Sequence, residues 1–345
     1  MTGELLFDVP ETSAMDVPGR LEERFDTVLS VLFIWFIAGV FSDGHNHVHG
    51  APVTFFTPEH GLFYSAFLAT FSIFGYFLYR GWKREGQPLE GLPGSHRLTL
   101  YGLVMFFAGG FGDMLWHGAF GIESTTEALY SPTHLLLAAG ASVFVSGPLR
   151  NLWDRDLSRN WREQFPVLTS SAVLLSVFTF MTMYAHLMLR PFGASWYSPA
   201  TASGATAIPA AAGIEIGMLS VMVQSAFLAG FALLLSDRFD LVPGALTYVL
   251  GLNAAGMAFL SGNYVLLPGF LLAAALSDIV YMERIPARGS TQFRAFAFLV
   301  PAMFHAAYFA TLFLAGGVTW SVHLWPGAIF LAGITGLLLS YVMEP

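Results

Sequence analysis

Long apolar segments alternate with short polar segments along most of the chain. An apolar run of 18 or more residues is long enough to cross a bilayer as a helix. The pattern therefore predicts an all-α polytopic membrane protein, with a polar cytoplasmic tail at residues 1–25 and one transmembrane domain at residues 26–345. The ten predicted helices lie near 26–43, 58–80, 97–118, 132–149, 165–189, 209–235, 243–261, 265–282, 293–315 and 321–342.

The predicted helices group into five hairpins that share features of sequence. Asp43 and Asp113 are 70 residues apart, and Thr182 follows after a further 69. This spacing indicates an internal repeat with units near 26–80, 97–149, 165–235, 243–282 and 293–342. Proline is favoured in the first turn of a helix, and the second helix of each unit has one near its start: Pro58, Pro132, Pro199, Pro268 and Pro326.

Composition and charge support a membrane location. Charged residues make up 11% of the chain, whereas soluble domains carry about 25%. If the N-terminus lies inside, every Lys and Arg except Arg190 falls on the inner side of the predicted helices. The positive-inside rule then places both termini in the cytoplasm and the protein in the plasma (inner) membrane. The net charge of −8 offers no basic surface for nucleic acid.

Two of the hairpins carry the same set of candidate metal ligands. In each set an Asp and a His are four residues apart, so they share one face of a helix. A second His follows a Thr-Pro or Ser-Pro pair that is typical of the start of the next helix. One carboxylate and two imidazoles can bind a transition metal. The two sets, both expected on the extracytoplasmic side, are Asp43, His47 and His60, and Asp113, His117 and His134. The alternative is that these are interfacial side chains hydrogen-bonded to water.

Five further polar residues are candidate accessory groups. His45 and His49 flank His47 and could be spare ligands, and Glu123 lies between the ligands of the second set. His186 is the histidine that the third repeat unit retains. Glu215 lies within an apolar run, where a carboxylate is a candidate for proton or ion binding.

The first ligand set resembles a copper site in the C-type membrane subunit of the copper membrane monooxygenases, the particulate methane and ammonia monooxygenases. That family's pattern is Asp-x2-Trp-His followed, after twelve residues, by Thr-Pro-x-His. Residues 43–60 match the spacing of this pattern. Residues 113–134 match its residue types, with Trp116 before His117, but have sixteen residues between His117 and His134. The resemblance covers the metal motifs alone. It implies copper, an extracytoplasmic metal site and the oxidation of a small apolar substrate with O2.

Three functions remain open from the sequence. The first is a copper-dependent oxidoreductase, acting alone, as a homo-oligomer or with other membrane subunits. The second is a copper or zinc carrier or sensor in which His45, His47 and His49 take up the metal. The third is a structural membrane subunit whose hairpins a metal clamps together. The chain has no Cys, so thiolate ligands are excluded, whereas non-haem iron also suits two His and one carboxylate.

Overall fold

The computed structural model describes residues 21, 24–50, 57–121, 129–198, 210–284 and 289–343. The predicted tail lies almost entirely outside these ranges. Within them the chain is helical, and its sole β-type pairing is an isolated bridge between Ala194 and Val318. The main helices are α2 (Phe25–Val48), α3 (Pro58–Glu85), α4 (Arg97–Phe120), α5 (Pro132–Val145), α6 (Gly147–Asn151), α7 (Trp161–Met181), α8 (Ala210–Arg238), α9 (Ala245–Ser261), α10 (Leu267–Arg284), α11 (Thr291–Ala315) and α12 (Trp325–Met343). The all-α prediction is confirmed for the described residues.

In the part of the chain that the structure describes, eight helices are long and apolar enough to cross a membrane, namely α2, α3, α4, α7, α8, α10, α11 and α12. The other two predicted spans are shorter, with 14 residues in α5 and 17 in α9. At 1.5 Å per residue they reach about 21 and 26 Å, less than the roughly 30 Å of a bilayer core. Helix α5 ends at Val145, shortly before Pro148, which cannot donate a backbone hydrogen bond and instead lies in the first turn of α6.

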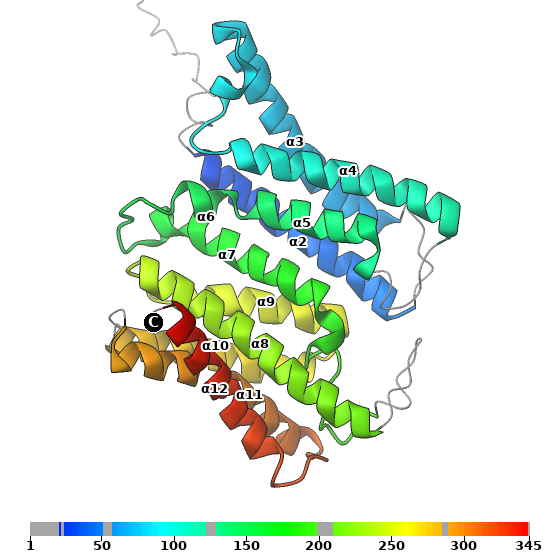
Figure 1. Cartoon of the computed structure of the whole chain (residues 1–345), viewed down its shortest axis with the longest axis vertical. Coiled ribbons are helices and arrows are strands. Elements are labelled where there is room, and N and C mark those ends of the chain that lie inside the picture. The colour runs from blue at the N-terminus through cyan, green and yellow to red at the C-terminus, as the bar shows by residue number, and fades with distance from the viewer. Residues whose placement is uncertain are drawn as a thin grey trace, which may run out of the picture.

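Consecutive helices form most of the predicted hairpins. The pairs α2–α3, α4–α5, α9–α10 and α11–α12 pack along one another, whereas α7 packs mainly on α2 and α9, and α8 on α12 and α11. Figure 1 shows the helices stacked from α3 and α4 at the top to α11 and α12 at the bottom. The third hairpin is therefore not a closely packed pair, and the five-unit repeat stays a prediction.

An aromatic cluster joins the first two hairpins. Phe36 of α2 lies with its ring centroid 5.3 Å from Phe106 of α4 and 5.0 Å from Phe144 of α5. Phe67 of α3 lies 5.0 Å from Phe106. Tilted and edge-on ring contacts of this kind add to the stabilisation that burial provides.

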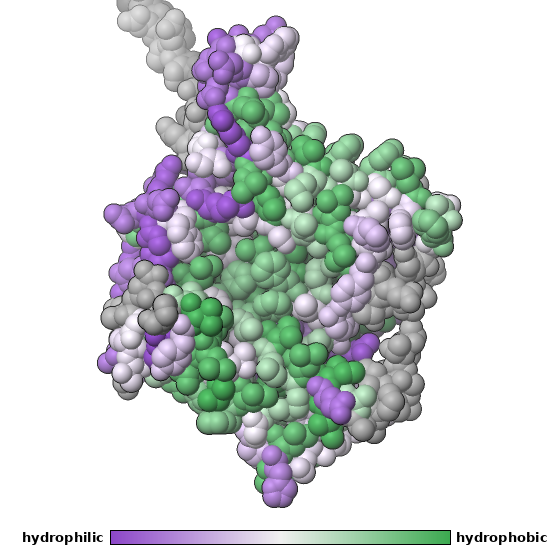
Figure 2. Space-filling view, viewed as in Figure 1, coloured by the Kyte–Doolittle hydropathy of each residue, from purple (hydrophilic) through white to green (hydrophobic). Residues whose placement is uncertain are grey.

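On the outside, Figure 2 shows a broad hydrophobic surface across the middle of the molecule, as a lipid-facing surface requires.

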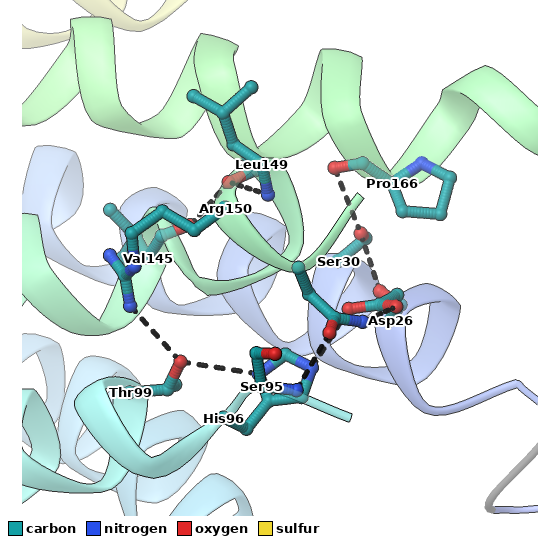
Figure 3. A network of polar contacts seen from close by, with 11 residues as sticks. Asp26, Ser30, Ser95, His96, Thr99, Val145, Leu149, Arg150 and Pro166 are labelled. Carbon is teal, nitrogen blue, oxygen red and sulfur yellow. Dashed lines mark hydrogen bonds and ion pairs between the residues drawn. The ribbon is translucent and has the colours of Figure 1, made fainter. Parts of the chain in front are cut away.

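A polar network joins the start of α2, the start of α4 and the short helix α6 (Figure 3). Asp26, near the start of α2, accepts a 2.7 Å hydrogen bond from Asn151 of α6 and lies 3.0 Å from Nε2 of His96, just before α4. Arg150 donates a 3.2 Å bond to Thr99 of α4. Because buried polar groups must be paired, this network holds α2, α4 and α6 in one arrangement.

Candidate metal centre

Each candidate ligand set lies where one helix ends and the next begins. Asp43 and His47 occupy the last turns of α2, and Asp113 and His117 those of α4. His60 and His134 lie in the first turns of α3 and α5, after Thr57-Pro58 and Ser131-Pro132. The Ser131 hydroxyl accepts a 3.3 Å bond from the backbone N–H of His134, the expected N-cap contact. The antiparallel hairpins thus bring the third ligand of each set to the other two.

The second set is compact. Its residues each contribute one ligand atom, and these atoms all lie within 4.8 Å of one another. Nε2 of His117 lies 3.1 Å from Oδ2 of Asp113, and Nδ1 of His134 lies 3.2 Å from Oδ1. Two atoms that each lie about 2.1 Å from one ion are about 3.0 to 3.4 Å apart. The distances from His117 and from His134 to the Asp113 carboxylate fall in this range, each to a different oxygen.

Neighbouring groups orient these ligands. The Thr133 hydroxyl donates a 2.8 Å bond to Oδ1 of Asp113, and the Ser131 hydroxyl lies 2.8 Å from Nδ1 of His134. Nδ1 of His117 lies 3.1 Å from the carbonyl oxygen of Gly121. A carbonyl only accepts, so Nδ1 carries the proton, and the lone pair of a neutral ring is on Nε2. Since Nε2 faces a carboxylate oxygen, a proton or a metal cation must lie between them.

The first set is looser. Nδ1 of His60 lies 3.0 Å from Oδ1 of Asp43, but Nε2 of His47 lies 3.6 Å from Oδ2. Although Oδ1 of Asp43 is buried and close to His60, it has no partner with hydrogen-bond geometry among the described residues. An orphaned buried carboxylate oxygen beside two imidazoles suits a cation. Within the described ranges, however, the second set alone brings three ligand atoms within 4.8 Å of one another.

The two sets are neighbours, and Tyr64 of α3 lies near both. The Tyr64 hydroxyl is within electrostatic range of both Asp43 and Asp113, and a methyl group added to Gly110 of α4 would lie 3.3 Å from it. The Tyr64 ring stacks on His60 with 6.1 Å between centroids. His47 is also within electrostatic range of His117. No local sequence pattern indicates this proximity, because it depends on how α3 packs against α4.

The candidate accessory residues are not gathered around the second set. The rings of His45 and His49 lie tilted against each other with 4.0 Å between centroids, and Nδ1 of His45 lies 2.8 Å from the carbonyl oxygen of Phe259 in α9. Glu123 lies outside the described residues. Glu215 is exposed on α8, and His186 is buried after α7, where it lines a different cavity. Their proposed roles in metal or proton binding remain predictions.

Two functional groups were missed from the sequence. Thr133 occupies the variable position of Ser-Pro-x-His, although the first turn of a helix directs that residue toward the preceding helix of the hairpin. Tyr64 occurs four residues after His60, and this spacing predicts that the two side chains lie on the same face of the helix. No family model, curated protein or solved structure matches this chain. Support for the site therefore comes from its own geometry.

Proposed function

We propose that this protein is a membrane metalloprotein that holds a copper ion with Asp113, His117 and His134. A second ion would be held by Asp43, His47 and His60. The single observation that carries the proposal is the convergence of the Asp113, His117 and His134 ligand atoms within 4.8 Å. The Gly121 carbonyl adds support, because it fixes the His117 tautomer that leaves Nε2 available to a metal.

The ligand chemistry favours a transition metal. Imidazole nitrogen suits copper, zinc, nickel and iron, and among divalent first-row ions copper binds such ligands most tightly. The carboxylate of Asp113 supplies one negative charge, so it partly neutralises the ion, and Thr133 restricts its orientation. Zinc and non-haem iron are the alternatives that metal analysis distinguishes.

We further propose an oxidoreductase role, with the protein acting alone or as a subunit of a membrane complex. Bound copper would supply a one-electron redox couple and open coordination positions. Phe63, which packs on Phe36 of the aromatic cluster, lies with its ring centroid 5.4 Å from that of His60 in the first set, and such apolar surroundings would favour a small apolar substrate over a polar one. The positive-inside pattern supports placing these sites on the extracytoplasmic side.

The second candidate function is structural. Each ligand set takes residues from two helices of one hairpin, so a bound ion would stabilise the pairing of α4 with α5 whether or not it reacts. Copper chemistry and clamping predict different consequences of ligand loss. Without its ion, an oxidoreductase loses activity while keeping its fold, whereas a clamped subunit loses thermal stability.

The experiment compares metal content, EPR spectrum and melting temperature of the full chain in lipid nanodiscs. The variants are His117→Ala and His47→Ala, and His323→Ala, an exposed histidine between α11 and α12 that belongs to neither ligand set, is the matched control. The proposal predicts a type-2 copper signal that each ligand variant reduces in part and the control preserves. If zinc or iron is bound in place of copper, the proposed metal site stands, but its proposed chemistry changes. A metal-free protein that also fails to bind added copper would contradict the metal site itself.

A further inference from the structure

A second group of buried polar side chains surrounds a cavity in the C-terminal half of the molecule. The cavity has a volume of about 20 Å³ and lies among α7, α8, α9, α10 and α11. Most of its wall is apolar. Its polar lining consists of Thr179, His186, Gln224, Asn253 and His305. None of these belongs to the two candidate ligand sets, so a ligand in this cavity would be independent of the proposed metal function.

Backbone partners fix the tautomers of the two histidines. Nδ1 of His186 accepts a 3.1 Å bond from the backbone N–H of Met188, so the proton of the neutral ring is on Nε2. Nδ1 of His305 lies 2.8 Å from the carbonyl oxygen of Pro301. That nitrogen must donate, so Nε2 of His305 is an acceptor. Burial, with His305 nearby, lowers the pKa of His186 to about 3, so its ring is neutral at physiological pH.

Gln224 adds a donor without a partner. Its side chain is 5% exposed, and Nε2 has no hydrogen-bond partner among the described residues. Asn253, on the facing helix α9, already donates a 2.5 Å bond to Thr179. Leaving a buried amide without a partner is unfavourable, because the group gives up its hydrogen bonds to water and gains none in return. The side chains that line the cavity therefore include two that carry a donor, His186 and Gln224, and one that carries an acceptor, His305.

We propose that this cavity binds one small uncharged hydroxyl molecule, either water or the smallest alcohol, between His186, Gln224 and His305. Such an oxygen accepts two hydrogen bonds through its lone pairs and donates one through its O–H. A water molecule needs about 10 to 15 Å³ of such space and two to four polar partners, and both are present. A metal cation does not fit, because Nε2 of His186 carries a proton and no carboxylate is among the residues that line the cavity.

The test uses the full chain with 15N-labelled histidine rings in lipid bilayers and solid-state NMR. If water fills the cavity, NMR magnetisation should be transferred from water protons to Nε2 of His305 and to Nε2 of His186. Gln224→Met keeps the size of the side chain and removes its donor, so it should lower this transfer at least about threefold. The control is Ser225→Ala, which changes the next residue of α8. Ser225 is also buried, but it does not line the cavity.

Two further measurements show which molecule fills the cavity and whether it is filled at all. With 13C-methanol added, a carbon contact to the ring of His305 identifies an alcohol site, and water transfer alone identifies a water site. Gln224→Met should lower the melting temperature if the cavity is filled. A melting temperature that rises, together with no transfer to either ring, would show an empty cavity and overturn the proposal. Concerted shifts of both Nε2 signals on adding Cu(I) would overturn it in favour of a metal.

Discussion

The Thr133 hydroxyl donates a 2.8 Å hydrogen bond to Oδ1 of Asp113, one of the three candidate ligands of the compact set. Glu59 occupies the same position in the first hairpin, before His60. An ionised carboxylate has no proton to donate, and Oδ1 of Asp43 is left without a hydrogen bond. We infer that the missing donor contributes to the looser geometry of the first set.

Thr133→Val should weaken metal binding to the second set. Valine keeps the shape of threonine but removes the hydroxyl that orients Asp113. Loss of such a supporting bond typically costs 10- to 100-fold in metal affinity, and the same range is expected here, measured by competition with a copper chelator. Thr335→Val, on α12, removes a hydroxyl bonded to its own helix and serves as the control. Equal effects of the two variants would contradict the proposed role of Thr133.

Glu59→Thr should have the reverse effect on the first set. A threonine at this position could donate to Oδ1 of Asp43 as Thr133 does to Asp113. We expect affinity to rise about tenfold at the first set. Glu59→Ala removes the same negative charge without adding a donor, so it separates the hydrogen bond from the change in charge. If the threonine variant binds metal no more tightly than the alanine variant, this explanation of the looser site is wrong.

Gly140→Ala should separate α5 from α4 and destabilise the protein. A methyl group at Gly140 would lie 2.6 Å from the backbone nitrogen of Phe106, which is too close for the helices to keep their spacing. Overpacking of this kind costs about 1 to 3 kcal/mol, and the melting temperature should fall. In the control Gly75→Ala, the methyl group meets no atom within 4 Å. That helical substitution should be neutral or stabilising by up to about 1 kcal/mol.

The stability of the protein should fall as the pH is lowered from about 6.5 toward 3. The pKa of His186 is about 3 in the folded protein and near 6.5 when exposed. Between these values the unfolded chain binds a proton that the folded chain does not, so unfolding is favoured as pH falls. His186→Gln should flatten the dependence of melting temperature on pH in this window. Part of the slope should remain because His305, on α11, faces the same cavity. An unchanged slope would contradict the assignment to His186.

Much of the candidate site follows from local sequence rules. The i, i+4 spacing of Asp113 and His117 requires one helix face, and Ser131-Pro132 defines where the next helix begins. The antiparallel return of the chain from α4 to α5 then brings His134 to the other two ligands. These steps need no knowledge of distant packing, which is why the compact ligand set could be predicted.

The relationships between hairpins could not be predicted in the same way. Tyr64 reaches the second set because Gly110 lets its hydroxyl approach α4, and no local pattern encodes that contact. The length of α5 was overestimated because the apolar run continues through the break before Pro148. Glu215 was a candidate for an internal carboxylate, yet it is exposed on α8. An apolar run alone does not say which face of a helix is buried.

The most direct test of the central claim is pulsed EPR of the copper-loaded protein in lipid nanodiscs, which counts the imidazole nitrogens bound to each ion. With the first set disabled by His47→Ala and His60→Ala, the remaining copper should have two imidazole ligands, and further removal of His134 should reduce this to one. Copper bound by fewer than two imidazoles in the first of these variants, or a spectrum that loss of His134 leaves unchanged, would contradict a metal centre formed by Asp113, His117 and His134.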